Sequence, residues 1–340
     1  AYHFQTNPFV SISDDLWDCD AEVETGLSHA MMYNGACSSN SHPWIEGTRS
    51  WASAYEGVRK CNMFLTHIDE ANVKSETNRA RWKAEARLLR AAIYSNLLCN
   101  YGALTIILTK PNMYDDDFSF VQKYNGAATR EEGYRKVIDF IFGDIDTALM
   151  EETIPWRNTS GSEANRVTKA LGLAIKSRFA LYAASPLNQA MTWEEAYQIN
   201  HAALQQLRDN GYELYKTCRN TSEFGIYGSK GQVKWSKGAD AAAAISEYFC
   251  SNPDFSTSER DLETIFSTRG NGGGVPWYVN GVGFQGGYRC GMVPTQELVD
   301  QYENVVYNST EATASYFVLD LEKPYMDEKH LMPNYNTENP

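Results

Sequence analysis

Residues 78–102 read "NRARWKAEARLLRAAIYSNLLCNYG", and this stretch decides the fold class. Apolar and small side chains recur in it every three or four residues, which is the spacing of one face of an α-helix. A glycine follows the last residue of the pattern, where a helix C-terminus favours the left-handed conformation. The stretch therefore predicts a long helix that ends at Gly102 and buries a stripe made of Ala86, Leu89, Ile93, Leu97 and Tyr101.

The stretch before it has the same spacing. Residues 51–71, "WASAYEGVRKCNMFLTHIDEA", predict a helix with a single apolar stripe. Cys61 in this helix and Cys99 in the next are expected to be buried free thiols, because an unpaired cysteine behaves as a small apolar side chain. The predicted stripe consists of Ala54, Val58, Cys61, Leu65 and Ile68.

Three more helices are predicted further along the chain. Residues 130–150 begin with acidic side chains, which suit the positive end of a helix dipole. Residues 165–185 carry small side chains that would let another helix approach closely, in a stripe of Ala170, Ala174, Ser177, Leu181 and Ala184. Residues 192–211 start with a capping box of Thr192 and Glu195 and end at Gly211.

These patterns predict a mostly α fold in which paired helices form a scaffold similar to tetratricopeptide repeats, over about residues 48–215. The rest of the chain, residues 1–47 and 216–340, is richer in loop-forming residues. A few short strands are expected there, one of them within 262–268, and residues 106–108 could form a strand or an extended segment. We expect a single domain over 1–340.

Composition excludes some function classes. The 30 basic and 43 acidic residues give a net charge of −13, which repels nucleic-acid phosphates, so no nucleic-acid partner is expected. The seven cysteines form no CxxC pair, and the six histidines have no partner at ligand spacing. We therefore expect no metal and no cofactor. Aromatic residues make up 13% of the chain, with tyrosine in the largest excess.

Membrane attachment has no direct signal in the sequence. No run of eighteen apolar residues could span a bilayer. The chain begins with "AYHFQTNPFV", without a start methionine or an apolar leader, and ends with "LMPNYNTENP". Both ends are interpreted as cut or processed.

Four ordered stretches resemble one protein family. "EARLLRAAIYSNLLCNYGALTIIL" resembles the EARFLRA...YGG.PL signature of the SusD/RagB family, the outer-membrane glycan-binding lipoproteins of gut-type Bacteroidetes. "NRVTKALGLAIKSRFALYAASPLN" resembles the family's R.TKGAA.A.KAR..LYAASPL block, "LETIFSTRG" its N.E.IF segment and "MVPTQELVDQYE" its PTQELVD.YE block. The agreement runs from about residue 48 to residue 303.

The resemblance implies a single SusD-like domain that lacks the family's signal peptide and C-terminal extension. It also implies a non-catalytic protein on the outer membrane at the cell surface, attached by a lipid anchor that this chain does not contain. Such a protein captures oligosaccharide or polysaccharide and delivers it to a SusC-like TonB-dependent transporter for uptake. RagB-type relatives are tied to peptide uptake, so a peptide ligand is the alternative. The family's glycan contacts lie in variable loops, so ligand residues must be chosen on physical grounds.

A glycine-rich loop supplies most of the candidate ligand residues. Residues 269–291, "RGNGGGVPWYVNGVGFQGGYRCG", contain a Gly-x-Gly-x-x-Gly pattern, but the residues that follow break any helix, which argues against a dinucleotide site. Pyranose rings stack on aromatic faces while polar groups bond their hydroxyls, and glycines allow close backbone approach. The loop is therefore predicted to bind sugar through Trp277, Tyr278 and Tyr288, with Asn280, Gln285 and Arg289 as polar neighbours. The alternative is that Trp277 fills a gap in the core.

Trp17 is a further ligand candidate outside this loop, because aspartates flank this ring and could accept hydrogen bonds from sugar hydroxyls. Trp44 directly precedes the first helix and fits a hydrophobic staple better than a ligand contact. Adjacent acids such as Glu194 and Glu195 point away from each other on a helix, so they do not form a glycosidase pair. A helical glycoside hydrolase or lyase and a scaffold that binds only protein or peptide remain the two alternatives from other classes.

Overall fold

The computed structural model describes residues 16–18, 51–108, 123–158, 163, 166–214, 262–266, 292–302, 304–308, 313–329 and 332–336. The chain divides into two compact units. The helical unit comprises Gly47–Arg269, and the terminal unit combines Ala1–Glu46 with Gly270–Pro340. The expected single domain stays a prediction, and each unit is described by itself.

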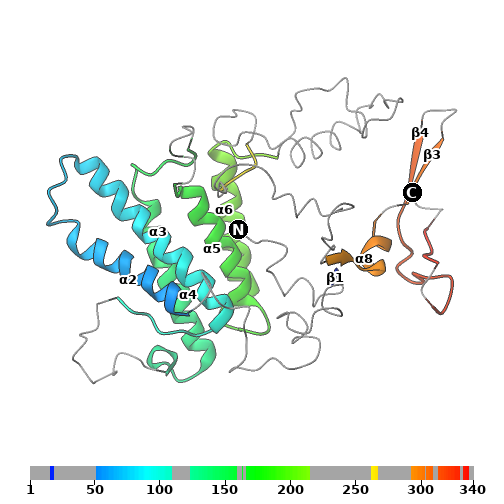
Figure 1. The fold of residues 1–340 in the computed structure, drawn as a ribbon, viewed down its shortest axis with the longest axis horizontal. Coiled ribbons are helices and arrows are strands. Elements are labelled where there is room, and N and C mark those ends of the chain that lie inside the picture. Colours follow the sequence, from blue (N-terminus) through cyan, green and yellow to red (C-terminus); the bar gives the residue numbers. More distant parts are fainter. Residues whose placement is uncertain are drawn as a thin grey trace, which may run out of the picture. The chain divides into compact units, whose positions relative to one another are not determined.

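In the described residues of the helical unit, five helices pack against one another in chain order (Figure 1). Helix α3 packs against α2, α4 and α5, and α5 also packs against α4 and α6. Short connections join α2 to α3 and α5 to α6, so these two pairs form helical hairpins, as the spacing patterns predict. The bounds are α2 Trp51–His67, α3 Glu76–Tyr101, α4 Arg130–Leu149, α5 Lys169–Ala184 and α6 Trp193–Asp209. The mostly α prediction is confirmed.

The buried faces of the helices are wider than the predicted stripes. Several residues that were predicted to be buried are exposed or half-buried, and others are buried in their place. In α3, Leu89 is 48% exposed, whereas Arg90 and Tyr94 are buried, because helices α2, α4 and α5 surround α3 on several sides. In α2 the buried residues include Asn62 in place of Cys61 and Leu65, which are only half-buried.

Two more predictions of burial are wrong. Leu181 of α5 is 47% exposed, and Phe179 and Ala180 beside it are buried instead. Cys99 is a free thiol, as expected, but it is exposed. In each case the spacing identifies a helix correctly, while the neighbours that decide which side is covered come from elsewhere in the chain.

The helix ends agree closely with the sequence signals. Gly102 adopts φ 71° after α3, and its backbone N–H donates to the carbonyl of Leu98. Gly211 has φ 80° and follows the C-terminal cap of α6. At the start of α6, Thr192 and Glu195 form the predicted capping box. None of the described helices combines the length and the apolar character that crossing a lipid bilayer requires.

The capping box gives a test that depends on pH. The pKa of Glu195 is lowered by a hydrogen bond from the backbone N–H of Thr192 (2.8 Å), by that residue's hydroxyl and by Arg135. A lowered pKa means that the carboxylate stabilises the fold above its ordinary pKa of 4.5, and that this contribution is lost as the pH falls through the lower folded value.

We expect Thr192→Ala to lower the free energy of unfolding by about 1 kcal/mol at pH 7, because the cap is removed. Glu195→Gln should cost less stability at pH 7 and nothing below the folded pKa. Urea unfolding followed by circular dichroism at pH 7 and pH 3 measures both. A deficit for Glu195→Gln that persists unchanged at pH 3 would contradict the role of the charge.

For residues 106–108 the sequence left a strand and an extended segment as alternatives, and the structure excludes the strand, because residues 104–108 pair with no neighbouring strand. Residues 262–266 likewise form no strand, and residues 267–268 lie outside the described residues. Backbone groups of the first segment bond side chains instead of a neighbouring strand. Such bonds satisfy its polar backbone atoms without a sheet.

The described part of the terminal unit contains short elements. Strands β1 Leu16–Asp18 and β2 Met292–Pro294 pair antiparallel, with Trp17 opposite Val293. Strands β3 Asn304–Asn308 and β4 Thr313–Phe317 form a second antiparallel pair. The short helix α8 Gln296–Asp300 begins at Thr295, whose hydroxyl accepts from the backbone N–H of Leu298. These strands agree with the few short strands predicted for this region.

Candidate functional site

The predicted ligand residues fall almost entirely outside the part of the chain that the structure describes. This applies to Trp277, Tyr278, Asn280, Tyr288 and Arg289, and also to Gln285, Trp44 and the glycine pattern. Trp17 lies in β1, where only its backbone is described. The assignment of Trp17 and of the glycine-rich-loop residues to a ligand site therefore stays a prediction.

The first of the four sequence blocks forms a buried ion pair at the centre of the helical unit. Arg90 of α3 donates through Nε and Nη2 to both carboxylate oxygens of Asp144 in α4, each at 2.7 Å. Its remaining nitrogen, Nη1, donates to Oδ1 of Asn62 in α2 at 2.7 Å. Arg87 adds a bond of 3.1 Å to the same carboxylate. One guanidinium thus joins three helices.

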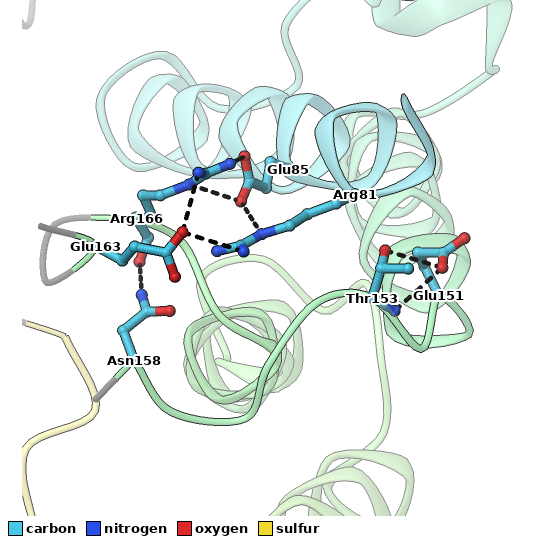
Figure 2. A network of polar contacts seen from close by, with 7 residues as sticks. All are labelled: Arg81, Glu85, Glu151, Thr153, Asn158, Glu163 and Arg166. Carbon is cyan, nitrogen blue, oxygen red and sulfur yellow. Dashed lines mark hydrogen bonds and ion pairs between the residues drawn. The ribbon is translucent and has the colours of Figure 1, made fainter. Parts of the chain in front are cut away.

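A second ion cluster connects the first two sequence blocks (Figure 2). Arg166, just before α5, donates to both carboxylate oxygens of Glu85 in α3, at 2.7 and 3.0 Å. Arg81 donates to Glu85 as well, at 3.0 Å, and lies 3.2 Å from Glu163. Because a bidentate arginine–carboxylate pair has a fixed geometry, it sets how the start of α5 meets α3.

The end of the first block is held by side chains of neighbouring elements. The hydroxyl of Tyr55 donates to the carbonyl of Thr105 at 2.5 Å. Tyr94 accepts from the backbone N–H of Ile107 at 2.8 Å. Burial raises the pKa of Tyr94 to about 12, so this hydroxyl stays neutral in the physiological range. These contacts fix the extended segment that follows α3.

Asn125 holds the same segment from the other side. It lies in the 3₁₀ turn η5 Lys123–Gly126, donates to the carbonyl of Leu104 and accepts from the N–H of Ile106. Asn125 and Tyr124 both have φ 53°, a left-handed conformation that asparagine tolerates better than tyrosine does. The described residues of the first two blocks therefore determine packing, and none of their charged pairs is arranged as a ligand site.

Four described acidic groups are engaged in the same kind of contact. Glu195 belongs to the capping box, and Glu194 accepts from Gln198 at 2.7 Å. Asp144 and Glu85 are held by arginines, as above. Among the residues that the structure describes, no group of three or more His, Cys, Asp or Glu side chains could hold a metal ion.

Helix α6 exposes aromatic rings that the sequence analysis did not single out. Trp193 and Tyr197 are each 58% exposed. The side of α6 that packs on α5 carries the buried residues Ala196 and Ala203. The signal was present in the sequence, because two rings four residues apart lie on one side of a helix, about 90° around it from that alanine face.

No family model and no curated protein matches this chain. Solved structures match it at low identity. A SusD-like protein from Bacteroides fragilis is 22% identical over 64% of this chain and 36% of its own, with a TM-score of 0.49. Surface glycan-binding protein A from Bacteroides uniformis is 18% identical over 65% of this chain and 42% of its own, with a TM-score of 0.47.

A third matching structure, surface glycan-binding protein A from Bacteroides thetaiotaomicron, was solved in complex with laminarihexaose. It is 18% identical over 63% of this chain and 40% of its own, with a TM-score of 0.44. The chain spans roughly two fifths of the length of these three proteins, from 36% to 42%. Of these three structures, the one from Bacteroides fragilis carries the SusD-like name.

Proposed function

We propose that this chain is part of a SusD-like protein that binds glycan without catalysis. The observation that carries the proposal is the order of the four sequence blocks together with the contact between the first two. Glu85 of the first block and Arg166 of the second are 81 positions apart and form a bidentate pair. The first two blocks that resemble the family are therefore in direct contact, and each supplies one partner of this ion pair.

The wider role follows from the same family resemblance. The protein would lie at the cell surface on the outer membrane, attached by a lipid anchor. It would pass the captured oligosaccharide or polysaccharide to a SusC-like TonB-dependent transporter for nutrient uptake. A net charge of −13 would not hinder binding of a neutral sugar.

Chain connectivity supports a ligand site in the terminal unit. Strand β2 starts at Met292, three residues after Arg289, so the two Cα atoms lie within roughly 11 Å of each other. Trp17 is the direct partner of Val293 across the β1–β2 pair. Two regions that the sequence analysis selected separately, the amino-terminal loop and the glycine-rich loop, are thus attached to neighbouring strands of one small sheet.

Replacing the two leading rings tests the site. We expect Trp277→Ala with Tyr278→Ala to weaken retention on a matching polysaccharide about tenfold or more, since each good stack contributes on the order of 1 kcal/mol. Affinity electrophoresis against a panel of neutral polysaccharides, laminarin included, measures it. Thermal unfolding should be unchanged, which separates lost contact from lost fold.

Other outcomes of the same experiment distinguish the alternatives. Undiminished retention of the double variant would rule out these rings as the platform. Release of shortened sugars from the polysaccharide would show an enzyme. Binding to a peptide array without retention on any polysaccharide would favour the RagB-type function.

A further inference from the structure

We propose that the exposed side of α6 is a second carbohydrate-binding surface, a strip on which two successive rings of a neutral pyranose chain stack. This inference rests on the proposed glycan-binding function and adds a site outside the glycine-rich loop. We call Trp193 and Tyr197 the aromatic strip, and the neighbouring Glu194 and Gln198 the polar strip.

The aromatic strip has the spacing that a chain of sugar rings requires. Its two residues are one helical turn apart, a rise of about 6 Å for four residues, so both rings face the same side of α6. Each residue is 58% exposed although each carries a large apolar ring. The spacing is of the order of one pyranose unit, so successive rings of an oligosaccharide would meet successive aromatic faces.

Tyr197 has a neighbouring ring on α6. Its ring lies 5.8 Å from the imidazole of His201, centroid to centroid, at an interplanar angle of 32°. A ring supported by a neighbour loses less rotational freedom when a ligand binds, which favours affinity. Trp193 directly follows the N-cap residue Thr192, so its backbone is fixed at the first position of the helix.

The polar strip supplies groups for the sugar hydroxyls. Glu194 and Gln198 repeat the spacing of the aromatic strip, one residue further along, so the two strips run side by side at about 100° around the helix. The amide Nε2 of Gln198 donates to Oε1 of Glu194 at 2.7 Å, which orients both groups. The free carboxylate oxygen and the amide oxygen remain as acceptors for hydroxyl donors.

The chemistry selects the class of ligand. A stacking face beside hydrogen-bond acceptors fits the apolar face and the hydroxyl rim of a pyranose. The carboxylate of Glu194 would repel an anionic sugar or a phosphate. A helix from another protein would bury the aromatic strip equally well, but it would leave the polar strip without hydroxyl partners.

The full chain should be compared with a Trp193→Ala, Tyr197→Ala variant, using laminarihexaose in calorimetric titration and laminarin, xylan and starch in affinity electrophoresis. We expect the stoichiometry for the hexasaccharide to fall from two sites to one. Retention on the polysaccharide that holds the native chain should fall, because one of the two binding surfaces is lost. Helicity should be unchanged, since alanine is a good helix former at both exposed positions.

Two further variants make the result specific. Glu194→Ala with Gln198→Ala should weaken retention less than loss of the two rings does. Leu187 is an apolar residue outside the strips that is 80% exposed, so Leu187→Ala should leave retention unchanged. Full retention and unchanged stoichiometry in the ring variant would overturn the proposal. A difference in oligomeric state between the native chain and the ring variant on size exclusion would also overturn it, because it would show that a second copy covers the strip.

The proposals for the aromatic strip and for the glycine-rich loop can be contradicted independently of each other. The Trp277→Ala, Tyr278→Ala variant could lose binding while the α6 variant binds like the native chain. This result would agree with the proposed function and contradict only the proposed α6 surface. A native chain that none of the three polysaccharides and no hexasaccharide binds would contradict both.

Discussion

Replacing Asp144 by alanine should lower the free energy of unfolding by about 3–5 kcal/mol, the largest single effect that we expect in this protein. Asp144 is 3% exposed and accepts from Arg90 through both oxygens. Without the carboxylate, the guanidinium stays buried with Asn62 as its main partner, and the desolvation of its charge is no longer offset. Urea unfolding followed by circular dichroism measures the loss.

Asp146, two residues further along α4, provides the matched control. It also forms an ion pair, with Lys176 at 2.6 Å, but its side chain is 46% exposed. Water screens such a pair, so Asp146→Ala should cost at most about 1 kcal/mol. Replacing both buried partners, Arg90→Met with Asp144→Leu, should cost less than Asp144→Ala alone. Equal losses for Asp144→Ala and Asp146→Ala would show that burial of the charge is not the cause.

Gly133→Ala should have the second-largest effect, a destabilisation of about 1–3 kcal/mol. A methyl group at this position of α4 would lie 2.5 Å from Cβ of Tyr124 and 2.9 Å from its Cα. The obstacle is partly backbone, so a change of rotamer cannot relieve it. If the turn moves away, Asn125 loses its two bonds to the segment 104–106 that follows α3.

The same helix contains the opposite case. A methyl group at Gly143 would meet no atom within 4 Å, so Gly143→Ala should stabilise the protein by about 0.5–1 kcal/mol through helix propensity alone. The two substitutions are chemically identical, and their effects should differ in sign. Thermal and urea unfolding of both variants check this. Stabilisation by both would mean that the 3₁₀ turn η5 does not press on α4.

These predictions concern the scaffold, and the scaffold is also what the family resemblance describes. Glu85, Arg87 and Arg90 come from one short block of sequence, and the structure uses them all as ion-pair partners of other elements. A block of this kind predicts the fold more directly than the ligand. The candidate ligand residues in the glycine-rich loop come from chemical reasoning alone and need the binding experiments above.

The prediction of buried faces shows where a periodic pattern is insufficient. The stripe assigned to α3 included Leu89, which is exposed, and missed Tyr94, which is fully buried. A stripe argument assumes one covered side, whereas α3 has helices on several sides. Likewise the run Ile106-Ile107-Leu108 has the composition of a strand, but the side chains of Asn125 and Tyr94 accept from the N–H groups of Ile106 and Ile107 in place of a neighbouring strand.

The sequence by itself determined the helices and their ends, because these depend on residues within a few positions of each other. The capping box of Thr192 and Glu195 and the left-handed glycines at 102 and 211 are of this kind. Only the tertiary structure decided which side chains are buried and that Arg90 shares Asp144 with Arg87 across two helices. Those outcomes depend on residues more than fifty positions apart, and only packing brings such residues together.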